Sequence, residues 1–190
     1  MKIICFGDSN TFGYDPRSYF GGRYSADSRW VDILAEKSGW EIKNYGQNGR
    51  SIPGFDMEYE LLGNIFEKEK AQLLIIMLGS NDLLQGLSAK SAAARMGRFI
   101  KNLHYSAERI LLVAPPPFKS GAWVETEAQI EASEQLSEHY RELAGKLGIA
   151  FADAAEWDVQ LCHDGVHFTE RGHRAFAAGI FYVIKDLKEI

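Results

Sequence analysis

Residues 73–82 read Leu73-Leu74-Ile75-Ile76-Met77-Leu78-Gly79-Ser80-Asn81-Asp82, an apolar run followed by a polar turn. A short apolar run bounded in this way is typical of a buried strand. Similar runs lie on both sides of it along the chain, at residues 3–6, 42–45, 110–114 and 149–152. This stretch therefore predicts one strand of a sheet with about five strands.

Amphipathic stretches with helical period separate these runs. They cover residues 28–37, 57–68, 92–103, 125–147 and 170–188. Alternation of strand and helix favours right-handed βαβ units. The predicted fold is α/β: a mainly parallel, about five-stranded sheet with helices on both faces, in a three-layer α/β/α sandwich. Such sheets bind ligands at the carboxyl ends of their strands, so the residues that follow each strand are the candidates for a site.

The length and charge of the chain limit its class. Its 190 residues fit a single domain, residues 1–190. It carries 21 Lys and Arg against 26 Asp and Glu, a net charge of −5, without a block of basic residues. We therefore expect no nucleic-acid partner. No apolar run has the length of a signal or membrane segment, so we expect a soluble, cytoplasmic protein without a membrane partner.

The first strand leads into Gly7-Asp8-Ser9-Asn10. A serine just past a buried strand, beside a glycine that permits a tight turn, presents its hydroxyl at the active edge of the sheet. Ser9 is therefore a candidate nucleophile. The alternative, equally consistent with this segment alone, is a turn in which Ser9 caps a helix.

Two further turns offer hydrogen-bond donors for an oxyanion. Asn81 emerges at the same edge as Ser9, and its side-chain amide suits this role, while Asp82 is expected to cap the following helix. Gly46 and Gly49 follow the second strand and allow close backbone approach, which makes the amide of Gly49 a second candidate. Each turn alone is also explained as an ordinary connection.

The C-terminal segment contains Asp164-Gly165-Val166-His167. One irregular turn would fold the carboxylate of Asp164 back onto the imidazole of His167. An acid in that place fixes the tautomer of the ring and stabilises its protonated form, as a general base for serine requires. Thr169 is expected to cap the last helix.

The remaining histidines and cysteines are assigned no chemistry. His163 lies four residues from His167, but the intervening Gly165 argues against a shared helical face, so we expect no metal. His104 and His139 are expected on helix surfaces, and His173 begins a helix without an evident partner. Cys5 and Cys162 are expected to be buried thiols; a disulfide would require the fold to bring them together.

Together these turns supply a hydroxyl, a base, an orienting acid and oxyanion donors, the parts that acyl transfer from an ester requires. Four blocks in chain order resemble those of the SGNH, or GDSL-like, hydrolases. They are Gly7-Asp8-Ser9, Gly49, Gly79-Ser80-Asn81-Asp82 and Asp164-Gly165-Val166-His167. Asn10 departs from this pattern, because the common block carries leucine or isoleucine there.

The resemblance implies a flavodoxin-like sandwich with no metal and no organic cofactor. It implies that Ser9 is the nucleophile, that His167 is its base and that Asp164 orients His167. The oxyanion hole would consist of the backbone amides of Ser9 and Gly49 and the side-chain amide of Asn81. The second block, Gly-Gln-Asn-Gly-Arg-Ser, is a loose version of the family block, which leaves Gly46 as the alternative to Gly49.

Further segments are similar to the bacterial arylesterase and acyltransferase branch of this family, whose members take short-chain acyl esters and often form oligomers. These segments are residues 5–9, 29–30, 75–79, 114–117 and 164–169. We therefore expect a serine esterase for short acyl groups such as acetyl, with an aryl or alkyl alcohol or an acetylated carbohydrate as substrate. Acyl transfer and a homo-oligomer are further expectations from this branch.

Residues 14–27 and 115–123 are the most loop-like and reach the same edge of the sheet. Their aromatic side chains are expected to narrow the pocket, stack on a leaving group or cover a subunit interface. These are Tyr14, Tyr19, Phe20, Tyr24, Phe118 and Trp123.

Two other functions compete with the esterase. An α/β-hydrolase also orders its triad as Ser, Asp, His, but Ser9 follows the first strand and lacks a G-x-S-x-G elbow. A non-catalytic, flavodoxin-like module could cradle a phosphate or FMN on residues 9–11, but it would leave the loop of Asp164 and His167 without a role.

Overall fold

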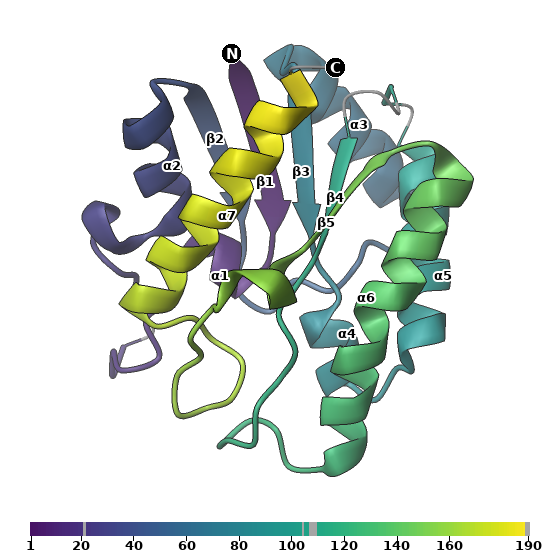
Figure 1. The fold of residues 1–190 in the computed structure, drawn as a ribbon. Helices are drawn as coiled ribbons and strands as arrows, with labels where there is room; N and C mark the ends of the chain where they lie inside the picture. The colour runs from purple at the N-terminus through teal and green to yellow at the C-terminus, as the bar shows by residue number, and fades with distance from the viewer. Residues whose placement is uncertain (21, 104, 107–109, 189–190) are drawn as a thin grey trace.

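The computed structural model describes residues 1–20, 22–103, 105–106 and 110–188. Five strands form one sheet in the order β2-β1-β3-β4-β5, and neighbouring strands pair in parallel (Figure 1). The strands are β1 (Lys2–Gly7), β2 (Glu41–Gly46), β3 (Leu73–Met77), β4 (Ile110–Ala114) and β5 (Ala150–Asp153). The predicted parallel sheet is confirmed.

The register of the central strands brings three turns to one level. Gly7 at the end of β1 lies opposite Gly46 of β2 and Met77 of β3. The chain therefore leaves these strands at neighbouring points on the same edge of the sheet. This alignment is what gathers residues that are far apart in sequence into one site.

Helices cover both faces of the sheet. Ile4 and Phe6 of β1 point into a core with α3 (Asp56–Glu69), α5 (Ala89–Asn102) and α6 (Glu127–Leu147). Ile3 and Cys5 alternate with them and point into a second core with α2 (Trp30–Ser38) and α7 (Glu170–Lys188) (Figure 1). The central strands β1, β3 and β4 are thus apolar on both faces, as parallel strands between helical layers require. The three-layer α/β/α fold is confirmed.

The helices differ from the sequence prediction mainly at their starts. α5 begins at Ala89, three residues before the predicted start, because the Ser88 hydroxyl accepts from the Ser91 N–H and caps it. α2 begins at Trp30 because residues 26–28 form a separate 3₁₀ turn. The sequence did not predict three short elements: α1 (Ser9–Phe12), α4 (Ser80–Leu84) and a 3₁₀ turn at Ala154–Trp157.

Both cysteines are free thiols. Cys5 is fully buried, and desolvation raises the pKa of its thiol well above the usual value. Cys162 is half-buried and not fully buried as expected. His139 is half-buried on α6, and His104 lies outside the described residues. Within the described chain, no helix combines the length and apolar character needed to cross a membrane.

Candidate active site

Ser9 is the first residue of α1, directly after the turn that ends β1. The Asp8 carboxylate, and not Ser9, caps this helix by accepting from the Asn10 N–H at 2.9 Å. Gly7 makes the turn tight, since a Cβ atom there would lie 2.8 Å from the Met77 carbonyl oxygen. The alternative in which Ser9 is the helix cap is therefore wrong, and its hydroxyl is left to face the loop of His167.

Asp164, His167 and Ser9 form one line of hydrogen bonds. His167 Nε2 lies 2.9 Å from Ser9 Oγ, and His167 Nδ1 lies 2.8 Å from Asp164 Oδ2. All three residues are at least nine-tenths buried. Serine, imidazole and carboxylate therefore stand in the order that moves a proton from the hydroxyl to the ring.

The Asp164 turn holds the carboxylate ionised. Its other oxygen, Oδ1, accepts from the backbone N–H groups of Val166 and His167, each at 2.9 Å. Gly165 has φ +83°, a left-handed conformation that lets the chain reverse within this turn. Burial acts to raise the pKa of Asp164, but the hydrogen bonds from the His167 ring and the two N–H groups outweigh it and lower the pKa.

The C-terminal side of this turn is fixed to α7. Thr169 Oγ1 accepts from the Gly172 N–H at 3.0 Å, so the predicted Thr169 cap is confirmed. Before the turn, the Cys162 N–H donates to the His167 carbonyl oxygen at 2.7 Å. The loop that carries His167 is therefore attached at both ends.

Asn81 and Gly49 face Ser9 across a small cavity. Asn81 Nδ2 donates one hydrogen to the Arg50 carbonyl at 3.0 Å, which orients the amide and leaves its second hydrogen for a ligand. Gly49 has φ +71°, and a Cβ atom at this position would meet nothing within 4 Å. The Gly46 N–H is already bound to Asn44 Oδ1 at 2.8 Å, so the geometry favours Gly49 over Gly46.

Asp82 does not cap a following helix, contrary to the sequence prediction, because it lies within α4. Its fully buried carboxylate accepts from the Ile52 N–H at 2.9 Å and from Arg95 Nη1 at 3.2 Å. Desolvation raises its pKa, against the lowering effect of these donors. The carboxylate therefore fastens the segment after Gly49 to α4, a contact across 30 residues that local sequence does not reveal.

The cavity at Ser9 has a volume of about 170 Å³ and aromatic walls. The rings of Tyr14 and Trp123 lie 4.7 Å and 4.8 Å from the His167 ring, centroid to centroid. The cavity is lined by Ser9, Tyr14, Asn48, Gly49, Asn81, Trp123 and His167. A larger hollow between the α4–α5 turn and the start of α6, of about 470 Å³, contains none of these residues. The chemistry therefore belongs to the smaller cavity, which contains Ser9, Asn81 and His167.

Among the residues that the structure describes, metal-ligating groups do not gather around Ser9, His167 and Asp164. His163 is exposed, whereas His167 is buried and committed to Ser9 and Asp164. Over the described residues, no three His, Cys, Asp or Glu side chains are placed to hold one metal ion.

A sequence model of the GDSL-like lipase/acylhydrolase family matches residues 5–175. The chain belongs to this family. The resemblance inferred from the four sequence blocks is confirmed, and it places the Ser9 cavity within a hydrolase fold. No curated protein matches the sequence significantly.

Several solved structures are similar to this GDSL-like hydrolase. A carbohydrate acetylesterase from Sinorhizobium meliloti shares 25% identity with a TM-score of 0.84, covering 98% of this chain and 99% of the other. An aryl esterase from M. smegmatis shares 25% identity with a TM-score of 0.83 and the same coverage. Another carbohydrate acetylesterase family member from Sinorhizobium meliloti shares 26% identity with a TM-score of 0.81, covering 100% and 99%.

The aromatic residues of the two loops of this hydrolase have three different places. Tyr14 and Trp123 line the cavity, whereas Tyr24 and Phe118 are buried away from it. Tyr19 and Phe20 are 94% and 92% exposed and contact one another. The sequence prediction grouped all six, and only the first two narrow the site.

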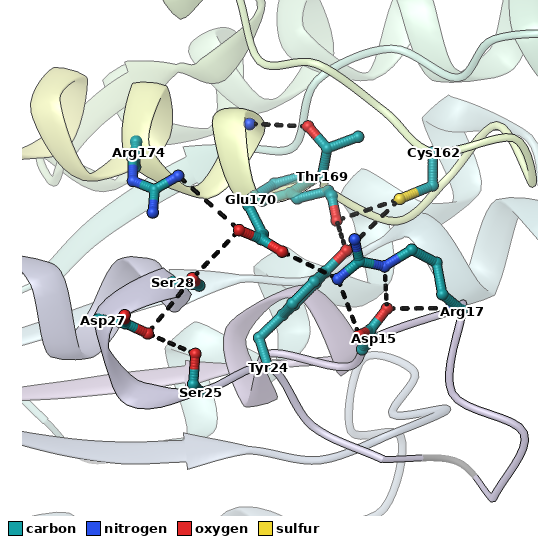
Figure 2. A network of polar contacts seen from close by, with 12 residues as sticks. Asp15, Arg17, Tyr24, Ser25, Asp27, Ser28, Cys162, Thr169, Glu170 and Arg174 are labelled. Carbon is teal, nitrogen blue, oxygen red and sulfur yellow. Dashed lines mark hydrogen bonds and ion pairs between the residues drawn. The ribbon is translucent and has the colours of Figure 1, made fainter.

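A polar network holds the first of these loops against α7 (Figure 2). The Arg17 guanidinium binds the Asp15 carboxylate at 2.9 Å and the Glu170 carboxylate at 3.0 Å. Beneath it, the Tyr24 hydroxyl donates to the Phe168 carbonyl at 3.2 Å. The loop that carries Tyr14 is thus attached to Phe168, the residue that follows His167.

His173 has a partner that the sequence analysis missed. It is fully buried, and its Nδ1 accepts from the Trp30 N–H at 3.4 Å. Tyr24 and Phe168 pack edge-on against its ring. Desolvation, with a smaller contribution from the Arg29 charge, lowers the pKa of His173 to about 3, so the ring is neutral at physiological pH.

Proposed function

We propose that this protein is a serine esterase that hydrolyses short-chain acyl esters through an acyl-enzyme on Ser9. The observation that carries the proposal is the hydrogen-bonded line from Asp164 through His167 to Ser9 at the floor of a small cavity. A nucleophile, a base within hydrogen-bond distance and a group that orients the base are the signature of nucleophilic catalysis.

In the first half-reaction, Ser9 Oγ attacks the ester carbonyl carbon while His167 Nε2 takes its proton. The tetrahedral intermediate then collapses, the bond to the alcohol oxygen breaks, and His167 returns the proton to the leaving alcohol. In the second half-reaction, His167 removes a proton from water while the water oxygen bonds to the acyl carbon. The acyl–Oγ bond then breaks, the carboxylic acid leaves, and His167 returns the proton to Ser9 Oγ. Asp164 stays ionised and stabilises the imidazolium in both halves.

The oxyanion formed in both steps needs donors that are fixed in advance. We assign this role to the backbone N–H groups of Ser9 and Gly49 and to Asn81 Nδ2. Asn81 is already oriented by Arg50, and Asp82 fastens the segment that follows Gly49. Asn81 is thus part of α4, and the segment that carries Gly49 is attached to α4 through Asp82.

The cavity supports a short acyl group. About 170 Å³ accommodates an acetyl or similar group, whereas ligand sites for drug-sized molecules measure roughly 300–1,000 Å³. Tyr14 and Trp123 offer aromatic faces for an aryl or sugar leaving group. The structural similarity to an aryl esterase and to carbohydrate acetylesterases agrees with this substrate class.

The same aromatic walls support acyl transfer as a second outcome of the acyl-enzyme. Trp123 is 49% exposed and lies over the His167 ring, where it could hold an acceptor alcohol in place of water. A non-catalytic FMN or phosphate module is less well supported, because the Ser9 hydroxyl is hydrogen-bonded to His167 and the cavity is small.

The test is a series of p-nitrophenyl esters from acetate to palmitate, followed by acetylated sugars, with wild type and Ser9→Ala. We expect the highest kcat/KM for acetate and a loss of about 10⁶ in kcat for Ser9→Ala. Product analysis with added alcohol measures transfer against hydrolysis. A preference for palmitate would refute the short-acyl assignment, and near-normal turnover in Ser9→Ala would refute the mechanism.

A further inference from the structure

Asn10, the residue after Ser9, is bound to both neighbours of His167. Its side-chain Nδ2 donates to the Val166 carbonyl at 3.1 Å, and its Oδ1 accepts from the Phe168 N–H at 2.9 Å. One amide thus pairs with the peptide groups on either side of His167, 156 and 158 residues away in sequence.

Asn10 is itself held in place by its backbone. Its N–H donates to Asp8 Oδ1 at 2.9 Å, and its carbonyl accepts from the indole Nε1 of Trp30 at 3.0 Å. Asn10 is 3% exposed and Trp30 is 1% exposed. The amide therefore projects from a fixed base that connects the end of β1 with the start of α2.

The chemistry of this place selects asparagine. It needs a donor toward Val166 and an acceptor toward Phe168 on one short, uncharged side chain, and an amide supplies both. Leucine has a similar size but supplies neither group. It would leave a buried carbonyl and a buried N–H without a hydrogen-bond partner, which is unfavourable in a folded protein. The departure from the leucine or isoleucine of the common block thus has a definite structural role.

We propose that Asn10 is a positioning residue that sets the distance between His167 Nε2 and Ser9 Oγ. Ser9 and Asn10 are consecutive residues of α1. The two hydrogen bonds from Asn10 to the residues on either side of His167 therefore fix the position of the base relative to the nucleophile. The inference rests on the proposed esterase function, because it assigns Asn10 to the Ser9–His167 step.

The expected effect is on kcat and not on KM. Asn10 does not line the cavity, so substrate binding should be retained. A displacement of a reacting group by about 1 Å can lower the rate by about 10²-fold. We therefore expect Asn10→Leu to lower kcat about 10- to 100-fold for p-nitrophenyl acetate, with KM within about twofold of wild type.

Asn10→Asp is the isosteric variant, and Asn44→Asp is its matched control. Asn44 has the same pattern of bonds: its Nδ2 donates to the Thr11 carbonyl and its Oδ1 accepts from the Gly46 N–H, each at 2.8 Å. It contacts neither flank of His167. Asn10→Asp should lower kcat by less than Asn10→Leu does, so that its kcat lies between those of Asn10→Leu and wild type. Asn44→Asp should change stability without a selective loss of kcat. Asn10→Leu carries no charge, so agreement between the two Asn10 variants excludes a purely electrostatic effect.

The measurements are kcat, KM, melting temperature and hydrogen exchange of the Phe168 amide in each variant. The inference is supported if both Asn10 variants lose kcat at constant KM, the Phe168 amide exchanges faster, and Asn44→Asp at a similar melting temperature keeps its kcat. It is overturned if the Asn10 variants keep their kcat, or if Asn44→Asp loses as much. If Asn10→Leu does not fold, the comparison between the two Asp variants decides. Wild type without Ser9-dependent hydrolysis would instead refute the proposed function, and the inference with it.

Discussion

Gly121 packs directly against the peptide group that joins Asp164 to Gly165. A Cβ atom at Gly121 would collide with the Asp164 carbonyl carbon and the Gly165 nitrogen. The Trp123 N–H donates to the Asp164 carbonyl at 3.0 Å from the same segment. The loop that places Trp123 over His167 is thus built onto the backbone of the residue that orients His167.

Gly121→Ala should therefore disturb stability and activity together. The added methyl group must push the loop away from Asp164, and overpacking of this kind costs about 1–3 kcal/mol in the free energy of unfolding. We expect a lower melting temperature and a reduced kcat for p-nitrophenyl acetate. Thermal unfolding and steady-state kinetics measure both.

Gly145→Ala is the control for this substitution. Gly145 is exposed within α6, and a Cβ atom there meets nothing within 4 Å. Replacing a helical glycine by alanine should raise stability by about 0.5–1 kcal/mol without changing kcat. A Gly121→Ala variant as stable as Gly145→Ala would show that the contact with Asp164 can relax freely.

Asn81→Ala should lower kcat by about 10²- to 10³-fold, the effect of removing one oxyanion donor. Gln85→Ala is the control, since Gln85, at the C-terminal end of α4, donates from Nε2 to Ser51 Oγ at 3.1 Å without lining the cavity. Equal losses of kcat in the two variants would mean that Asn81 acts by holding the loop, and not by binding the oxyanion.

His173 should make the protein less stable toward acid. Its pKa of about 3 in the folded state lies below the value of 6.5 in the unfolded chain, so the unfolded state binds more protons between these values. Its contribution is fully present above pH 6.5 and is lost as the pH falls toward 3, by on the order of 1.4 kcal/mol per pH unit.

His173→Phe removes this titration while keeping a ring between Tyr24 and Phe168. We expect the free energy of unfolding, measured with denaturant from pH 7 to pH 4.5, to fall less steeply than in wild type. The same substitution at the exposed His163 is the control. An unchanged pH dependence in His173→Phe would contradict the assignment.

The strands and the turn that brings Asp164 to His167 could be predicted because local patterns encode them. Buried parallel strands are apolar on both faces, so runs such as 73–78 are visible in the sequence. Asp164 and His167 are three residues apart, and the turn between them is local. The short helices α1 and α4 were missed because four or five residues are too few to show a helical period.

The contacts that position the site could not be predicted because they join distant segments. Asn10 meets Phe168, and Asp82 meets Ile52, only after the sheet has formed. Within one loop, Tyr14 faces the cavity while Tyr19 faces solvent. Both residues are tyrosines in the same loop, so residue type alone does not distinguish them. The tertiary contacts of Arg17 and Tyr24 decide which one reaches His167.

Asp8 stabilises the active-site turn through its hydrogen bond from the Asn10 N–H, but its buried negative charge destabilises the fold. It is 1% exposed, and desolvation raises its pKa to about 6, against the lowering effects of the Asn10 N–H and of the charges of His167 and Arg50. Because the folded pKa exceeds the unfolded value of 3.8, the folded state binds more protons between these values. Stability should therefore decrease as pH rises from 3.8 to 6, by on the order of 3 kcal/mol in total.

Asp8→Asn removes this charge and keeps an oxygen that can accept from the Asn10 N–H. We expect a gain in the free energy of unfolding of about 1–3 kcal/mol at pH 8, shrinking toward zero near pH 4. Denaturant unfolding of both proteins across this range measures the difference. A gain that is independent of pH would show that the effect comes from packing, and a loss at pH 8 would show that the ionised carboxylate is held by stronger partners than Asn10 and Arg50.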